Sequence, residues 1–227
     1  MQRNESLTHA HLTTPRAAAI AGILFSALLI GALTLLWISI PVDPLDPGAW
    51  LVTSLNRVQF ALSLMPFAGI AFLWFIGVLR DRLGESEDRF FATVFLGSGL
   101  LFLAMLFVAS AILAAIITAY EAMPSQLLNS GTFVFARAFA FNIMNIYAIK
   151  MAGVFMALTS TLALRTGFVA RWIALLGYPL ALLLLFGNFL FDLNLAIFPL
   201  WVLVISGYIL IDNFRQVQTS LPENASG

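Results

Sequence analysis

The sequence lacks cysteine, and its only two histidines, His9 and His11, stand near the N-terminus before any apolar segment. Without cysteine the chain has no disulfide, iron–sulfur cluster, thiolate metal site or cysteine nucleophile. Haem held between membrane helices normally uses histidine ligands, so a haem-based electron carrier is also excluded. Because cofactor and catalytic motifs are missing as well, we expect no cofactor, no metal site and no catalytic residue.

Charge is also scarce: 10% of the 227 residues are charged, 61% are hydrophobic, and 11 basic residues balance 11 acidic ones. A soluble domain is about half apolar and about a quarter charged. This composition excludes a soluble globular protein, a disordered chain and a nucleic-acid-binding protein. The apolar residues fall in blocks about as long as a bilayer is thick, which predicts an integral membrane protein in contact with lipid.

Six apolar runs are long enough to cross a membrane. A helix needs about 20 apolar residues to cross ~30 Å of hydrocarbon, where the backbone must satisfy its own hydrogen bonds. The sequence therefore predicts an all-α bundle of six transmembrane spans, at residues 17–40, 58–79, 90–120, within 133–164, 172–191 and 193–211. The transmembrane domain covers residues 17–212, between an N-terminal tail (1–16) and a C-terminal tail (213–227). Around Asp192 the last two spans form a tight hairpin.

Arginines are distributed unequally between the connecting segments. With six spans, eight arginines fall on one side of the membrane: Arg3, Arg16, Arg80, Arg82, Arg89, Arg165, Arg171 and Arg215. The loops on the other side contain no arginine or lysine. Cytoplasmic loops are enriched in Lys and Arg, so the pattern predicts that both termini are cytoplasmic.

Small residues spaced by four form stripes on three predicted spans: Ala18, Gly22 and Ser26; Ala111, Ala115 and Ala119; and Gly153, Ala157 and Thr161. Burial of apolar surface does not drive helices together within lipid, whereas small residues let two backbones approach closely. We expect these stripes to face neighbouring helices, within one chain or between copies.

The candidate ligand-binding residues lie toward the outer side of the predicted bundle: Arg57, Arg137, Asn142, Asn145 and Lys150. Lys150 is the only lysine, and charge within a membrane span is costly. Its long side chain reaching the interface is one explanation. Structural ion pairs are another, and the acidic partners within reach would be Asp43, Asp46, Glu121 and Asp192. The functional alternative is a basic pocket that faces outward and binds an anionic ligand or a lipid head group.

Two segments resemble known sequences. The segment 66–78 (PFAGIAFLWFIGV), followed by Arg80-Asp81-Arg82 and by residues 88–91 (DRFF), resembles a group of uncharacterised bacterial multi-pass membrane proteins. The segment 164–172 (LRTGFVARW) is similar to the short inner loop of several bacterial families of unknown function. The resemblance implies a bacterial inner-membrane protein and brings no known activity.

Three functions are compatible with these patterns. The favoured one is a non-enzymatic membrane protein that acts through contacts with lipid, with further copies of itself or with another membrane protein. The alternative is a small transporter or channel subunit with an outward-facing polar cavity. An intramembrane enzyme is the least favoured, because the sequence offers no pairing of nucleophile and base.

Overall fold

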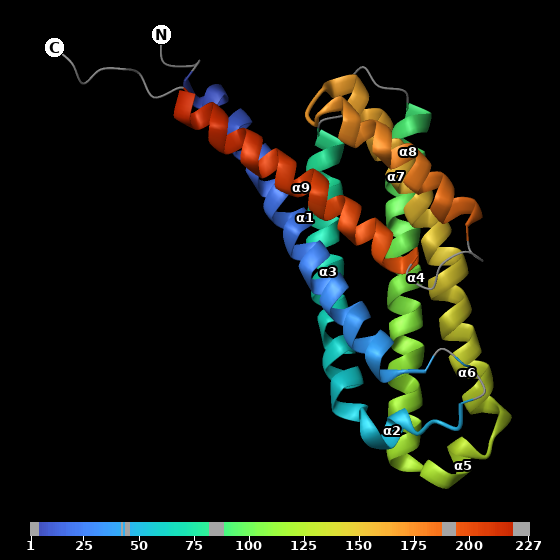
Figure 1. Ribbon diagram of the computed structural model, residues 1–227. Helices are drawn as coiled ribbons and strands as arrows, with labels where there is room; N and C mark the ends of the chain where they lie inside the picture. The colour runs from blue at the N-terminus through green and yellow to red at the C-terminus, as the bar shows by residue number, and fades with distance from the viewer. Residues whose placement is uncertain (1–4, 42, 44–45, 82–88, 188–193, 220–227) are drawn as a thin grey trace.

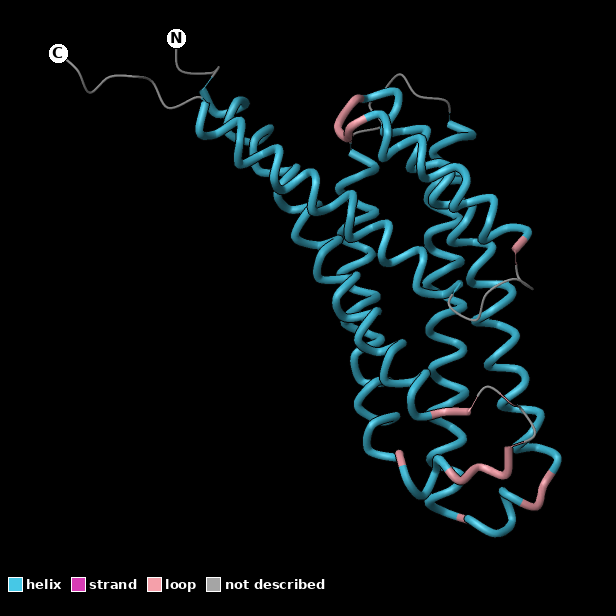
Figure 2. Tube along the Cα trace, in the orientation of Figure 1, coloured by secondary structure: helices cyan, strands magenta, loops and turns pink. Residues whose placement is uncertain are grey.

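The structure is a computed structural model that describes residues 5–41, 43, 46–81, 89–187 and 194–219. Figure 2 shows that nearly all of these residues are helical and that none forms a strand. The helices are α1 (Glu5–Ser39), α2 (Trp50–Thr53), α3 (Leu55–Asp81), α4 (Arg89–Ala122), α5 (Pro124–Leu128), α6 (Gly131–Asn142), α7 (Ile149–Thr166), α8 (Arg171–Phe186) and α9 (Asn194–Thr219). A π-helical segment, η1 (Ile143–Ala148), joins α6 to α7 without a break.

The long helices form a bundle whose two ends differ. In Figure 1, α3, α4 and the continuous α6–η1–α7 helix run along the long axis, while α1 and α9 lie side by side and cross them at an angle. The beginning of α1 and the end of α9 meet, and Arg16 Nε donates a hydrogen bond of 2.6 Å to Asn213 Oδ1. The end of α3, the end of α7 and the beginning of α8 lie toward this same end of the molecule, and they carry Arg80, Arg165 and Arg171. Helices α2 and α5 lie at the opposite end.

Five segments are long and apolar enough to cross a membrane: Arg16–Ser39, Leu55–Arg80, Phe90–Ala122, Gly131–Thr166 and Asn194–Asn213. The sixth, Arg171–Phe186, is apolar but has only 16 residues. The described residues therefore form the helical, multi-pass membrane architecture that the composition predicts. The number of complete crossings and the side of the termini stay predictions.

Several boundaries differ from those expected. Helix α1 begins at Glu5 and α9 continues to Thr219, so both helices extend into the predicted tails. The predicted fifth span is shorter, because α8 ends at Phe186 and Gly187 takes its C-cap position. The predicted hairpin around Asp192 lies outside the described residues.

Phenylalanine rings fill the centre of the bundle. Phe25 of α1, Phe72 of α3, Phe102 of α4, Phe155 of α7 and Phe198 of α9 are all buried. Phe72 contacts the other four rings, with centroid distances of 4.6 to 5.7 Å. Most of these pairs have the edge-to-face arrangement that aromatic rings prefer. Five helices thus share one aromatic core on the bundle axis.

Two of the three small-residue stripes face neighbouring helices, as predicted. A Cβ at Gly22 would collide with Ser206 Oγ of α9, and a Cβ at Gly153 would lie 3.1 Å from the backbone oxygen of Ala181 in α8. The stripe on α4 differs, because Ala111 and Ala115 are exposed. No described helix of the same chain covers that part of α4.

Candidate functional site

Arg137 is the most buried charged residue among those whose side chains are described, with 6% of its surface exposed. It projects from α6 toward the connection between α1 and α2. Its Nη1 donates to the backbone oxygen of Asp46 at 2.9 Å, and its Nη2 donates to the backbone oxygens of Pro41 at 2.9 Å and Asp43 at 3.0 Å. A planar guanidinium with several fixed donors suits three carbonyl groups that converge in this way.

The Asp46 side chain completes this contact. One carboxylate oxygen, Oδ1, lies 3.9 Å from Arg137 Nη1 and also accepts a 2.9 Å hydrogen bond from the backbone N–H of Gly48. Gly48 has a φ of +86°, where a side chain is strained, and its Cβ would lie 2.8 Å from Leu128 and Phe133. The Arg137 guanidinium also lies 5.6 Å from the centre of the Phe133 ring. Arg137 therefore holds the α1–α2 connection against α6.

The acidic residues proposed as partners have separate roles. Asp46 pairs with Arg137, and Asp43 offers Arg137 its backbone oxygen. Glu121, at the end of α4, accepts a 3.2 Å hydrogen bond from Gln59 Nε2 of α3. Asp192 lies outside the described residues. The hypothesis of a structural ion pair is thus supported for Arg137.

Lys150 lies at the beginning of α7 and is partly buried. Its Nζ donates a 2.8 Å hydrogen bond to the backbone oxygen of Leu185, in the last turn of α8. Carbonyl groups at a helix C-terminus have no partner within the helix and carry partial negative charge, so a cation is favourable there. Asn194, at the beginning of α9, donates from Nδ2 to the backbone oxygen of Gly187 at 3.2 Å. Lys150 and Asn194 together cap the end of α8.

The two asparagines lie between these cations on the same continuous helix. Asn142 is exposed at the end of α6. Asn145 lies in η1 and donates from Nδ2 to the backbone oxygen of Phe141, on its own helix, at 3.0 Å. Single-turn π-helical segments are rare and are frequent at functional sites, which makes this stretch notable.

Arg57 is exposed in the first turn of α3. It borders an open hollow of about 320 Å³ lined by residues 51–57, at the junction of α2 and α3. Helix α2 buries Trp50 and Leu51 beside this hollow, whereas Val52 and Thr53 face outward.

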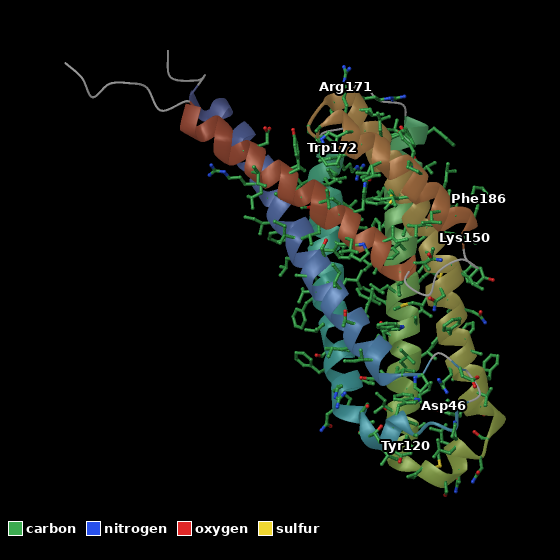
Figure 3. All side chains as sticks on the ribbon, in the orientation of Figure 1. Asp46, Tyr120, Lys150, Arg171, Trp172 and Phe186 are labelled. Atoms are coloured by element: carbon green, nitrogen blue, oxygen red, sulfur yellow. The ribbon has the colours of Figure 1, made fainter. Side chains whose placement is uncertain are left out.

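The structure does not bring the five predicted residues into one pocket. Figure 3 shows Lys150 near Phe186, about halfway along the molecule, and Asp46, which pairs with Arg137, near the far end. Arg137 and Lys150 therefore contact different parts of the chain. Ligand binding by the five residues stays a prediction.

One feature of these sites carries no signal in the sequence, and another has a weak one. The main acceptors of Arg137 and Lys150 are backbone carbonyl groups, which every residue possesses. Asn194 could have been noticed as an amide at the beginning of the last apolar segment, where its side chain can reach the turn before it.

No group of three or more His, Asp or Glu residues that could hold a metal ion occurs in the part of the chain that the structure describes. No protein-family model matches the chain, and no curated protein or solved structure shows significant similarity to it. Function is therefore inferred from the sequence and the geometry of this chain.

Proposed function

We propose that this chain is an integral protein of a bacterial inner membrane and that it acts without catalysis, through contacts with lipid or with other membrane proteins. All six apolar helices are embedded in the bilayer, and both termini lie in the cytoplasm. The arginines at the ends of α3, α7 and α8 support this orientation, because they lie toward the end of the molecule where α1 begins and α9 ends. The resemblance of residues 66–78 and 164–172 supports the bacterial origin.

The aromatic core is the observation that argues most strongly against a transport function. A pathway for a polar solute through a bundle needs polar groups along its axis. Here the axis is occupied by Phe25, Phe72, Phe102, Phe155 and Phe198, which pack ring against ring. Two of the three candidate cations that could attract an anion toward this axis, Arg137 and Lys150, already bond to backbone oxygens.

Reconstitution separates this proposal from the transporter alternative. Purified protein in liposomes is assayed for chloride, nitrate and phosphate flux, beside protein-free liposomes and a Lys150→Met variant. We expect no flux above that of protein-free liposomes. Flux that Lys150→Met abolishes would support a transporter with an outward-facing cavity and would contradict the proposal.

A second measurement tests whether the chain acts through contacts with lipid or with other proteins. Chemical cross-linking in native membranes, followed by purification, asks whether the chain is held by a stoichiometric protein partner or by further copies. We expect a cross-linked species with one of these or, where none forms, lipid that stays bound through purification. Protein that is recovered monomeric and free of bound lipid would contradict a role that depends on contacts.

A further inference from the structure

Two arginines bracket the apolar part of α3. Arg57 lies in its first turn and Arg80 in its last turn, and both are exposed. At about 1.5 Å per residue, the helix rises about 34 Å between them. This is close to the ~30 Å thickness of a hydrocarbon core. The levels of Arg57 and Arg80 therefore mark the two surfaces of the apolar layer.

Helix α8 is too short to cross this layer. It begins at Arg171, toward the Arg80 end of the molecule, and its 16 residues rise about 24 Å. The hydrogen bond from Lys150 to Leu185 fixes where α8 ends. Lys150 is about 22 Å from Arg165 along the axis of α7. Because α8 runs at an angle to α3 in Figure 1, these counts place its end at least about 10 Å short of the Arg57 level. Figure 3 shows Lys150 and Phe186 well short of Tyr120, which lies at the far end.

The chemistry at the end of α8 is that of a helix terminating within lipid. The backbone oxygens of Leu183, Leu185 and Gly187 accept hydrogen bonds from Gly187 N, Lys150 Nζ and Asn194 Nδ2, respectively. A helix end in water can leave its last carbonyl groups to the solvent. In hydrocarbon each such group must find a partner inside the protein. Side chains of α7 and α9 supply two of these three partners, and the backbone of Gly187 supplies the third.

Large apolar side chains are exposed at the same level, beside the polar Gln59 and Asn145. Phe186 is 79% exposed although it closes α8. Residue counts from the Arg80 end show which side chains lie between the level of the α8 end and the Arg57 level. The large exposed ones include Phe60 of α3, Phe107 and Val108 of α4, and Ile146 of η1. Acyl chains cover such a surface well, whereas water does not.

We propose that α8 and α9 form a re-entrant hairpin: α8 enters the bilayer from the Arg171 side and ends at least about 10 Å below the opposite surface under a cover of lipid acyl chains, and α9 begins beside that end and leaves on the side where α8 entered. Lys150 and Asn194 are the positioning residues that let α8 end at this depth. The inference rests on the proposed membrane location. It refines the six spans into four complete crossings and one hairpin, with both termini still on one side.

The absence of cysteine provides a direct test. Single-cysteine variants are reconstituted and exposed to a membrane-impermeant maleimide on both faces of the liposomes, so that protein orientation has no effect. The test position is Phe186→Cys. Met123→Cys, 52% exposed beyond the end of α4, is the control in water, and Leu100→Cys, 43% exposed in the middle of α4, is the control in lipid.

Because a thiol in hydrocarbon stays protonated and unreactive, Phe186→Cys should label about tenfold or more slowly than Met123→Cys, at a rate close to that of Leu100→Cys. Denaturing detergent should bring all three to equal labelling. Labelling of Phe186→Cys at the Met123→Cys rate would place the end of α8 in water and overturn the hairpin. Equal, fast labelling of all three would instead overturn the membrane location itself, so the two failures are distinguishable.

A second readout identifies what covers the end of α8. Phe186→Cys is labelled with bimane in detergent and returned to liposomes that contain a spin-labelled phosphatidylcholine. We expect quenching by the spin-labelled lipid and not by aqueous iodide. Quenching by iodide, or by neither quencher as under a second copy of the chain, would overturn the lipid cover.

The role of Lys150 is tested in the same background. Lys150→Met removes the donor to Leu185, and Lys150→Arg keeps one. We expect Lys150→Met to raise the maleimide labelling rate of Phe186→Cys several-fold and Lys150→Arg to leave it unchanged. An unchanged maleimide labelling rate in folded Lys150→Met protein would show that Lys150 does not position the end of α8.

Discussion

The only lysine of the chain, Lys150, donates a 2.8 Å hydrogen bond to the backbone oxygen of Leu185. The two residues belong to different helices, α7 and α8, and the contact joins a cation to the negative end of a helix dipole. A lysine at this depth therefore has a structural partner, and the partner is a helix end that needs a donor.

Replacing Lys150 by Met keeps an apolar stem of similar length and removes the donor. The Leu185 carbonyl group then has no side-chain partner, and an unsatisfied buried acceptor costs about 1–3 kcal/mol. We expect Lys150→Met to lower the free energy of unfolding by this amount and Lys150→Arg to retain most of it. Unfolding by sodium dodecyl sulfate in mixed micelles measures both. Equal stability of Lys150→Met and the parent would show that the hydrogen bond contributes nothing.

Arg137→Gln should be more harmful than the loss of an exposed arginine. The substitution removes the charge that pairs with Asp46 and leaves a single amide in place of a guanidinium that serves three carbonyl groups. Breaking a buried, hydrogen-bonded ion pair costs about 3–5 kcal/mol. Arg57→Gln, at an exposed position, should change stability by less than about 0.5 kcal/mol. Comparable losses in the two variants would contradict the structural role of Arg137.

Most of the fold could be predicted from apolar runs interrupted by charge. The runs around Ala18, Phe72, Phe102, Phe155 and Phe198 are helical because lipid leaves the backbone no other donor or acceptor. The end of α8 could not be predicted, because the apolar run resumes at residue 189 and only Gly187 and Asn188 signal a break. The depth of that break depends on Lys150, which is distant in sequence.

The candidate site was less accessible to prediction. Charge in an apolar chain identified Arg137 and Lys150 as residues that need partners, and it offered Asp46 as one of them. It could not show that backbone oxygens are the main acceptors, because their convergence depends on how the chain folds. The sequence also assigned Arg137 and Lys150 to the same side of the membrane, although they lie at different depths on one helix.

The close packing at Gly177 predicts that Ala there is destabilising and that a second substitution restores part of the lost stability. A Cβ at Gly177 of α8 would collide with Ser160 Oγ of α7 and lie 2.9 Å from the Trp201 ring. Overpacking costs about 1–3 kcal/mol, so Gly177→Ala should destabilise the protein by that amount. Adding Ser160→Ala removes the colliding oxygen and should recover part of the loss. At Gly77 and Gly97 a Cβ meets nothing within 4 Å, so Ala there should be neutral or stabilising, as the helix propensity of Ala favours.

Mixed-micelle unfolding of the three single variants and the double variant checks this packing. The expected pattern is a loss at Gly177, partial recovery with Ser160→Ala, and no loss at Gly77 or Gly97. A loss of equal size at Gly77 would mean that the effect comes from the helix backbone and not from contact between α7 and α8.

The aromatic core predicts a contrast between two phenylalanines on one helix. Phe72 is fully buried among four other rings, whereas Phe67 is 62% exposed. Phe72→Ala leaves a cavity and should cost about 3–5 kcal/mol. Phe67→Ala changes only surface that faces lipid and should stay within about 0.5 kcal/mol of the parent. Equal effects in thermal unfolding monitored by tryptophan fluorescence would show that the rings do not form the core described.

The proposed orientation of the chain can be tested at its two termini. It is inferred from the placement of the arginines and from the contact between the beginning of α1 and the end of α9. Fusing green fluorescent protein to either terminus should give fluorescent cells, and fusing alkaline phosphatase to either terminus should give no phosphatase activity, since both termini are expected in the cytoplasm. A phosphatase fusion at Glu121, beyond the apolar part of α4, is the positive control for the outer side. Activity at one terminus and fluorescence at the other would require an odd number of crossings, and the contact between Arg16 and Asn213 could not then form.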